Sequence, residues 1–304
     1  MSTKIQNDFS EIKIEESLYP LKLKAIRYPP KILYCRGNID IFKNQYFLAV
    51  VGTRNMTAYG RKALENILPA IAKRKIVIVS GLAIGIDILA HKMALDNDCP
   101  TIAVLAGGLD KIYPTENKKY AEEIVAKNGL LISEHPLGSG YLRQHFVARN
   151  RIISGLADAV VVAEAGSKSG ALITAEFAFR EKKRVFSLPG NIFSPESRGA
   201  NNLLRKEAKI LLDERDIIEY FFPDSATRKR SKKNQNKSSN KEKLISLTKN
   251  QKLIFDFLSF DISLSLNEII KKSQLNSAEV ITIISQLELK DLVESVGGSR
   301  YIRS

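Results

Sequence analysis

The sequence predicts an α/β protein with a mostly parallel, doubly wound sheet, followed by a small domain of helices and a hairpin. Three observations predict it. Short apolar runs alternate with longer amphipathic stretches through the first two thirds of the 304 residues, a basic segment without apolar residues follows, and helix-capping pairs recur after that segment. A chain of this length can hold two ordinary domains, so we expect a larger and a smaller one joined by a tether.

Seven short apolar runs predict the strands of the larger domain. Each has four or five residues and is followed by a polar residue or glycine and then a helical pattern, which is typical of strands buried on both faces of a parallel sheet. We therefore expect an extended Rossmann-like domain over residues 45–222, preceded by a short extended lead-in, residues 1–44, with one edge strand. The runs are Phe47–Val51, Ile76–Val79, Thr101–Leu105, Leu130–Ser133, Ala159–Ala163, Arg184–Leu188 and Lys209–Leu212.

A basic linker is expected after this domain, at residues 223–243. Its stretch from Arg228 to Lys243 contains eight basic residues, one acidic residue and no apolar residue. Such a segment cannot offset the entropy lost on ordering, so we expect it to be flexible. It serves either as a solubilising spacer or as an auxiliary nucleic-acid contact, and the sequence leaves both open.

The last segment, residues 244–304, has the pattern of a winged helix. Helices are expected where apolar residues share one helical face or where an N-cap residue precedes a glutamate by three positions. The expected elements are a helix over Lys249–Phe260, helices beginning at Leu266 and Ser277 with Ser265 and Asn276 as N-caps, and a hairpin of Leu292–Val296 with Arg300–Ile302.

Composition limits the possible functions. The net charge of +14 favours a polyanionic partner. The sequence has neither a run of 18 apolar residues nor a signal-like segment, so we expect a cytoplasmic protein without membrane contact. Cys35 and Cys99 lack CxxC spacing and neighbouring histidines, which argues against a metal site.

The candidate binding residues follow the predicted strands at their carboxyl ends. Open parallel sheets bind ligands at that edge, where helix amino termini present N–H groups and partial positive charge. Gly52 and Arg54 follow the first run, Ser80 and Gly81 the second, and residues 166–170 the fifth. Glycine-bearing loops at one edge suggest a surface for a phosphate backbone, although each glycine can equally serve turn geometry or helix packing.

A basic segment, residues 143–151, adds further candidates. Arg149 and Arg151 have the geometry for bidentate phosphate contacts, and Phe146 can either stack on a base or pack in the core. Cations beside an aromatic residue fit a single strand better than a small ligand. Adjacent helical residues point about 100° apart, so Arg149, Asn150 and Arg151 cannot all face one ligand, and at least one should be structural or solvated.

Residues for catalysis are scarce. No loop reads GxxxxGK[ST] or GxGxxG, so neither triphosphate hydrolysis nor dinucleotide binding is indicated, and no cofactor is expected. The three histidines lack metal-ligand spacing. Asp87 lies in the first turn of an expected helix, where a carboxylate complements the helix dipole, and we interpret it as structural. We expect no catalytic residue, and hence a protein that is not an enzyme.

Several strings together resemble the DprA/Smf family of DNA-processing proteins. The match runs over residues 28–222, and its most specific part is the RNRII segment from Arg149. The other strings are SGLAIGID from Ser80, GGLDKIYP from Gly107, SGALITA from Ser169 and LPG from Leu188. The resemblance implies a fold that binds single-stranded DNA without hydrolysing it, forms homodimers, and loads the RecA recombinase during natural transformation or recombination.

The predicted DNA contacts combine the strand-end residues with those that the resemblance implies. They share one edge of the expected sheet. The set is Gly52, Arg54, Ser80, Gly81, Phe146, Arg149, Asn150, Arg151, Gly166, Ser167, Lys168, Ser169, Gly170 and Thr174.

Two alternatives use other residues. A nucleotide-processing glycosidic hydrolase on the same fold would use Glu176 as its acid or base, but the loop before it lacks the PGG opening of such enzymes. A regulator would instead read duplex DNA with the winged helix. That domain has seven basic and seven acidic residues, and its expected recognition helix, residues 277–290, has one cation, Lys290, which favours contact with protein over duplex reading.

Overall fold

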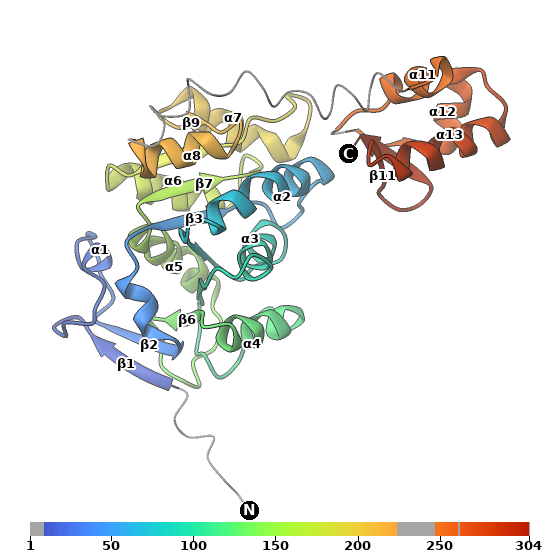
Figure 1. Ribbon diagram of the computed structural model, residues 1–304. Coiled ribbons are helices and arrows are strands. Elements are labelled where there is room, and N and C mark those ends of the chain that lie inside the picture. Colours follow the sequence, from blue (N-terminus) through green and yellow to red (C-terminus); the bar gives the residue numbers. More distant parts are fainter. Residues whose placement is uncertain (1–8, 224–246, 261, 304) are drawn as a thin grey trace, which may run out of the picture. The chain divides into compact units, whose positions relative to one another are not determined.

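The computed structural model describes residues 9–223, 247–260 and 262–303 (Figure 1). The chain divides into two compact units, the first made up of Met1–Met56 and Gly60–Phe222 and the second of Thr57–Tyr59 and Pro223–Ser304. The first unit is a doubly wound α/β domain and the second has the helices and sheet of a winged helix, so the predicted fold class is confirmed. The predicted linker, residues 223–243, lies outside the described residues except for Pro223.

A nine-stranded sheet forms the centre of the first unit. Its order is β1-β2-β6-β5-β4-β3-β7-β8-β9. The seven strands from β6 to β9 are parallel to one another, whereas β2 pairs antiparallel with both β1 and β6. The strands are β1 Phe9–Lys13, β2 Ile32–Gly37, β3 Phe47–Val51, β4 Val77–Ser80, β5 Thr101–Val104, β6 Leu130–Ser133, β7 Ala159–Val162, β8 Arg184–Ser187 and β9 Lys209–Ile210.

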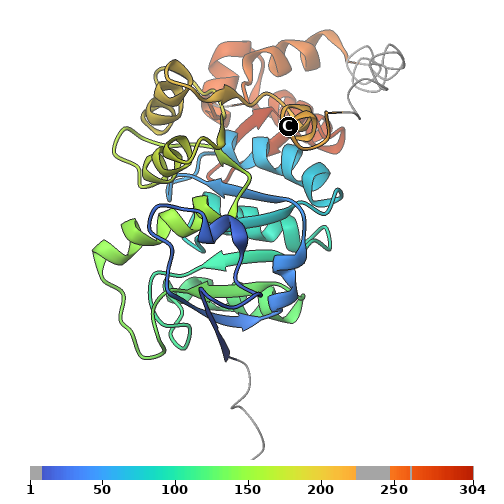
Figure 2. The ribbon, with the colours of Figure 1, turned by 90° about the vertical axis from the view of Figure 1, so that its left-hand side faces the viewer.

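Helices cover both faces of this sheet (Figure 1). Those that cross from β3 to β6 lie on one face, and α1, α5 and α6 lie on the other, which Figure 2 views from the front. No helix within the described ranges is long and apolar enough to cross a membrane. The helices are α1 Leu21–Lys24, α2 Ala58–Ala72, α3 Ile86–Leu95, α4 Lys118–Ala126, α5 Arg143–Leu156, α6 Ala171–Arg180, α7 Arg198–Arg205 and α8 Glu214–Phe221, with short 3-10 turns η1 Ile39–Lys43, η2 Thr115–Asn117 and η3 Pro195–Ser197.

The apolar runs predict the parallel strands closely. β3 and β6 have the predicted bounds, and the other five differ by at most two residues at either end. Every residue of β3 to β7 is buried. Burial on both faces requires a continuous apolar run, and this is why the pattern is legible in the sequence.

The first 44 residues contribute more structure than the single edge strand that the sequence predicts. β1 and β2 form an antiparallel pair at one edge of the sheet, with Phe9 opposite Arg36 and Lys13 opposite Ile32. Only Ile12 among the five residues of β1 is buried. An edge strand with one buried residue leaves no apolar run, so β1 has no signal in the sequence.

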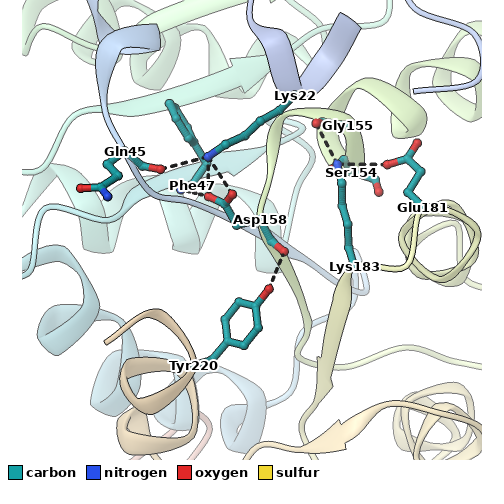
Figure 3. Close-up of polar contacts among 9 residues, drawn as sticks. All are labelled: Lys22, Gln45, Phe47, Ser154, Gly155, Asp158, Glu181, Lys183 and Tyr220. Atoms are coloured by element: carbon teal, nitrogen blue, oxygen red, sulfur yellow. Dashed lines mark hydrogen bonds and ion pairs between the residues drawn. The ribbon is translucent and has the colours of Figure 1, made fainter. Parts of the chain in front are cut away.

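Polar contacts tie the amino ends of the strands together (Figure 3). Lys22 Nζ lies 2.7 Å from the carboxylate oxygens of Asp158 and donates to the main-chain oxygen of Gln45 at 3.0 Å. Asp158 also accepts from the N–H of Phe47 at 2.9 Å, and the Tyr220 hydroxyl donates to its carbonyl oxygen at 3.3 Å. These contacts join α1 and α8 to the starts of β3 and β7.

Lys183 holds the carboxyl end of α5 (Figure 3). Its ammonium donates to the carbonyl oxygens of Ser154 and Gly155 at 2.7 and 2.8 Å and pairs with Glu181 at 3.0 Å. A cation at a helix carboxyl terminus satisfies the last carbonyls and complements the helix dipole. The contact therefore fixes α5 at the end opposite its amino half, which is the half that bears the basic segment.

The described residues of the second unit form three helices and a three-stranded sheet of order β10-β12-β11. Ser265 Oγ accepts from the N–H of Glu268 at 3.3 Å, and Asn276 Oδ1 accepts from the N–H of Glu279 at 2.8 Å. The predicted helix starts are therefore confirmed, whereas the two-residue strand β10 is too short to predict. The elements are α11 Lys249–Phe257, β10 Leu264–Ser265, α12 Leu266–Ser273, α13 Ser277–Leu289, β11 Val293–Ser295 and β12 Arg300–Arg303.

Candidate nucleic-acid interface

A cavity of about 900 Å³ opens at the carboxyl ends of β3 and β7. The strand order reverses between these two strands, because β3 leads towards β6 and β7 leads towards β9. Such a switch point is where open α/β sheets bind ligands. The predicted site residues that line the cavity are Gly52, Arg54, Phe146, Arg149, Asn150, Gly166, Lys168, Ser169, Gly170 and Thr174.

The glycines at this edge serve two different purposes. A Cβ on Gly52 would lie 2.5 Å from the Ile86 side chain, so Gly52 is needed for packing. A Cβ on Gly170 would meet nothing within 4 Å, and one on Gly166 would only touch the carbonyl of Pro195 at 3.4 Å. The loop between β7 and α6 is therefore open towards the cavity, where a ligand backbone has room to approach.

Exposed cations surround this open loop. Arg54, Arg143 and Lys168 are exposed and line the cavity. The Arg54 guanidinium lies 5.9 Å from the centroid of the Phe146 ring, which is cation–π distance. Two carboxylates also line the cavity, that of Asp87 and that of Glu196, which accepts from the Thr53 hydroxyl at 2.7 Å. The wall thus carries more positive than negative charge.

Arg149 has a different environment from these cations. It is 5% exposed, and its Nη1 donates to the carbonyl oxygen of Gly81 at 2.7 Å and to that of Val104. Burial lowers the pKa of Arg149 to about 10, so the group stays charged at neutral pH. The DNA contact of Arg149 stays a prediction, and the structure shows that its guanidinium holds the ends of β4 and β5.

Asp87 is the buried counter-charge of Arg149. The carboxylate is 6% exposed, accepts from the N–H of Gly81 at 3.1 Å, and acts electrostatically on Arg149. A buried cation needs such a partner, since an isolated one would cost several kcal/mol. The burial of Asp87 agrees with its interpretation as a structural residue, but the sequence does not predict that Arg149 is its partner.

His91 lies in the same buried region. Its Nδ1 is 2.8 Å from Thr101 Oγ1, and the Thr101 hydroxyl donates to the carbonyl of Ile78. Thr101 therefore accepts from Nδ1, and Nε2 is buried without a hydrogen-bond partner. Burial and the nearby Arg149 lower the pKa of His91 to about 3, so the ring is neutral.

Four predicted contacts lie outside the cavity lining. Ser80 is fully buried and donates to the Val50 carbonyl, and Gly81 is buried beneath the Arg149 guanidinium. Arg151 is paired with Glu134 at 2.6 Å. Ser167 is exposed but does not line the cavity. The sequence assigns these residues to the carboxyl edge of the sheet, but it does not reveal the direction in which each side chain points.

Asn150 and Thr174 are positioned by the fold. Asn150 Nδ2 donates to the carbonyl of Gly170 at 3.2 Å, so α5 supports the open loop directly. Thr174 is 1% exposed and lies in the cavity wall one turn into α6. Of the three consecutive residues from Arg149, one is buried, one contacts the loop and one is ion-paired, which agrees with the expectation that they cannot all face a ligand.

Two tyrosines in the cavity wall are not among the site residues predicted from the sequence. Tyr113 follows β5 and Tyr141 precedes α5, and both line the cavity together with Phe146. They occur in irregular segments, where aromatic residues have no periodicity to indicate their side. The GGLDKIYP string contains Tyr113 and is the one signal that could have found it.

Among the described residues, no group of three or more histidines, cysteines, aspartates or glutamates could hold a metal ion. Cys35 and Cys99 are both buried free thiols. The chemistry that the cavity offers is therefore contact by cations, main-chain amides and aromatic rings.

Comparison with known proteins identifies relatives over both units. Residues 10–222 match the family model described as DNA recombination-mediator protein A, and residues 239–299 match the DprA winged helix domain. DNA processing protein DprA of Bacillus subtilis is 39% identical over 214 residues, which cover 70% of this chain and 72% of the relative.

Two solved structures resemble the first unit. The X-ray structure of DNA processing protein A from Streptococcus pneumoniae has a TM-score of 0.66 at 40% identity and covers 70% of this chain and 74% of its own. That of DNA processing protein A from Helicobacter pylori, described for its single-stranded DNA binding mode, has a TM-score of 0.64 at 35% identity and covers 71% of this chain and 96% of its own. The chain therefore belongs to the DNA recombination-mediator protein A family, the DprA/Smf proteins whose strings the sequence contains.

Proposed function

We propose that the chain binds single-stranded DNA in the cavity at the switch point and presents it to the RecA recombinase during transformation or recombination. The observation that carries the proposal is the open loop of residues 166–170 beside three exposed cations, Arg54, Arg143 and Lys168. The single-stranded DNA binding mode described for the H. pylori relative supports it.

The geometry suits binding without regard to sequence. Guanidinium and ammonium groups contact phosphates, and the open glycines allow the sugar-phosphate chain to approach the main chain closely. Two polar side chains of the wall, those of Asn150 and Thr53, contact the protein itself, which leaves fewer groups to read base edges. We expect affinity to depend on salt much more than on base sequence.

A glycosidic hydrolase is less well supported. It would need a carboxylate facing the ligand, and Glu176 is an exposed residue of α6 outside the cavity lining. Asp87 and Glu196 do line the cavity. The Asp87 carboxylate accepts from the Gly81 N–H and neutralises Arg149, and the Glu196 carboxylate accepts from the Thr53 hydroxyl. We therefore propose a binding protein without hydrolytic activity.

Anisotropy titrations of labelled oligothymidine and of a duplex of equal length, between 50 and 200 mM salt, test the proposal. Each phosphate neutralised on a single strand contributes about 0.7 to the slope of log K against log salt. Arg54→Ala and Lys168→Ala should each weaken oligothymidine binding and lower this slope by about 0.7.

Arg180→Ala is the matched control, because Arg180 is an exposed cation at the far end of α6. It removes the same charge and should leave both affinity and slope unchanged. If duplex binds as well as the single strand, or if all three variants lower the slope equally, the positive charge acts diffusely and the proposed interface is wrong.

The remaining family properties, a homodimer and contact with RecA, are proposals that rest on the resemblance alone. The winged helix supports a contact with protein, since the Glu279 carboxylate in the first turn of α13 accepts from Asn250 and adds negative charge where duplex readers carry cations. Sedimentation of the full chain and co-precipitation with RecA, with and without oligothymidine, test the two proposals.

A further inference from the structure

The winged helix presents a helix face without charge to solvent. α13 packs four apolar side chains into the core of the second unit. Its two charged residues, Glu279 and Glu288, are half-buried at the flanks, so the exposed side carries no charge. We call this exposed side the α13 face. Its residues are Ser277, Ala278, Ile281, Thr282, Ser285, Gln286 and Leu289.

Two large apolar residues protrude from the α13 face. Ile281 is 49% exposed and Leu289 is 86% exposed. A helix that reads duplex DNA presents cations at these positions to approach the phosphates. Large apolar side chains on an uncharged exposed face are instead typical of a contact with protein.

An open groove of about 550 Å³ lies beside the α13 face, between α13 and the start of α11. Ala278 and Thr282 line it on the α13 side, and Thr248 and Asn250 line it on the α11 side. These side chains are short, so the groove has room for a large side chain from outside. The same helix therefore carries both a protruding leucine and a recess.

The protruding leucine and the recess are placed so that two copies of α13 fit each other. Leu289 follows Thr282 by seven residues, which puts the two on the same side of the helix about 10 Å apart. In an antiparallel pair with a two-fold axis midway between them, each Leu289 lies level with the groove of the other copy. Ser285 lies next to this axis, and its small side chain lets the helices approach closely. Such a contact is isologous, because each copy uses the same surface.

The distribution of charge favours a second copy as the partner. The whole chain has a net charge of +14, but residues 244–304 contain seven basic and seven acidic residues. The entire excess therefore belongs to the other residues, and two copies repel each other there. The winged helix is the part of the chain at which a second copy can approach without this repulsion.

We propose that the α13 face binds the α13 face of a second copy of this chain, with Leu289 of each copy in the groove of the other. A contact through one helix per copy is smaller than a standard interface of roughly 1,600 Å². We expect it to be weak alone and to form where other contacts hold copies close together. The inference goes beyond the proposed function, since the contact needs no DNA.

Disulfide cross-linking of the full chain tests this pairing. Ser285→Cys places a thiol beside the expected two-fold axis, and Lys271→Cys places one on an exposed position of α12 as the matched control. Cys35 and Cys99 are buried and should not react. Under mild oxidation without DNA, Ser285→Cys should form a disulfide-linked dimer at least about tenfold faster than Lys271→Cys, because the contact raises the effective concentration of the thiols.

Second substitutions in the Ser285→Cys chain test the groove. Leu289→Asp should slow dimer formation by about tenfold or more, because it brings an unpaired carboxylate to each groove. Leu289→Met keeps an apolar side chain and should stay within about twofold. Ile262→Asp changes an exposed apolar residue outside α13 and should have no effect. Thermal unfolding checks that each variant is folded, as expected for a residue as exposed as Leu289.

The outcomes separate a second copy from other partners. Dimer formation by Ser285→Cys should become faster as salt screens the repulsion between the basic copies. The proposal is overturned if Ser285→Cys forms dimers no faster than Lys271→Cys, or if Leu289→Asp does not slow the reaction. If Ser285→Cys is no faster and Leu289→Asp abolishes co-precipitation with RecA, the α13 face binds a different protein and the proposal is equally overturned. Since no DNA is added, failure of the proposed function would not change these results.

Discussion

Replacement of Arg149 by methionine separates a structural from a DNA-contacting role for this residue. The change removes a charge that is 5% exposed and leaves the carbonyls of Gly81 and Val104 without their donor and the Asp87 carboxylate without its counter-charge. Removal of one partner from a buried pair costs about 3–5 kcal/mol. We expect Arg149→Met to lower the free energy of unfolding by that amount in urea titrations.

The salt dependence of binding gives the independent measurement. A buried cation that contacts only protein releases no counterion from DNA, so the folded fraction of Arg149→Met should keep the wild-type slope of log K against log salt. Arg149→Met combined with Asp87→Asn should recover part of the stability, because the second change removes the uncompensated carboxylate. If Arg149→Met remains within about 1 kcal/mol of wild type in stability and its slope falls by about 0.7, Arg149 contacts phosphate directly and our reasoning is refuted.

Two further predictions concern His91, which is buried, and Lys183, which is partly buried. Because the pKa of His91 is about 3 in the folded chain and about 6.5 when unfolded, acidification below pH 6.5 protonates the unfolded chain first, and the imidazole costs about 2 kcal/mol of stability by pH 5. Urea titrations between pH 7.5 and 5 should therefore show a shallower pH dependence in His91→Gln, and equal slopes would contradict a neutral buried ring. Lys183→Met should lower stability by about 1–3 kcal/mol, because the carbonyls of Ser154 and Gly155 lose their donor. Lys182→Met removes the neighbouring exposed cation and should change thermal unfolding little; a similar loss in both variants would show that only charge matters.

The parallel strands could be predicted because burial on both faces constrains every residue. β3 reads FLAVV, and all five of these side chains are buried. β1 reads FSEIK and pairs at the edge of the sheet with only Ile12 buried. Its existence depends on the partner strand β2, which lies 19 residues further along the chain, and local sequence carries no information on that pairing.

The candidate site could be predicted in position but not in direction. Strand ends define an edge, so Gly52, Arg54 and the loop after β7 could be assigned to one surface. The sequence does not show that Ser80 donates inward to the Val50 carbonyl, whereas Lys168 remains exposed. That difference depends on which acceptors the fold brings within reach, and these come from other strands.

The contacts of the two arginines in the RNRII string explain why we do not expect the charge of that string to bind DNA. Arg149 binds carbonyls at the ends of β4 and β5, and Arg151 is neutralised by Glu134. Both hold α5 against the sheet, and their positions leave Phe146 and Asn150 on the cavity side. We therefore expect the affinity for a polyanion to come from cations outside the RNRII string, such as Arg54, which lies 5.9 Å from the Phe146 ring of α5.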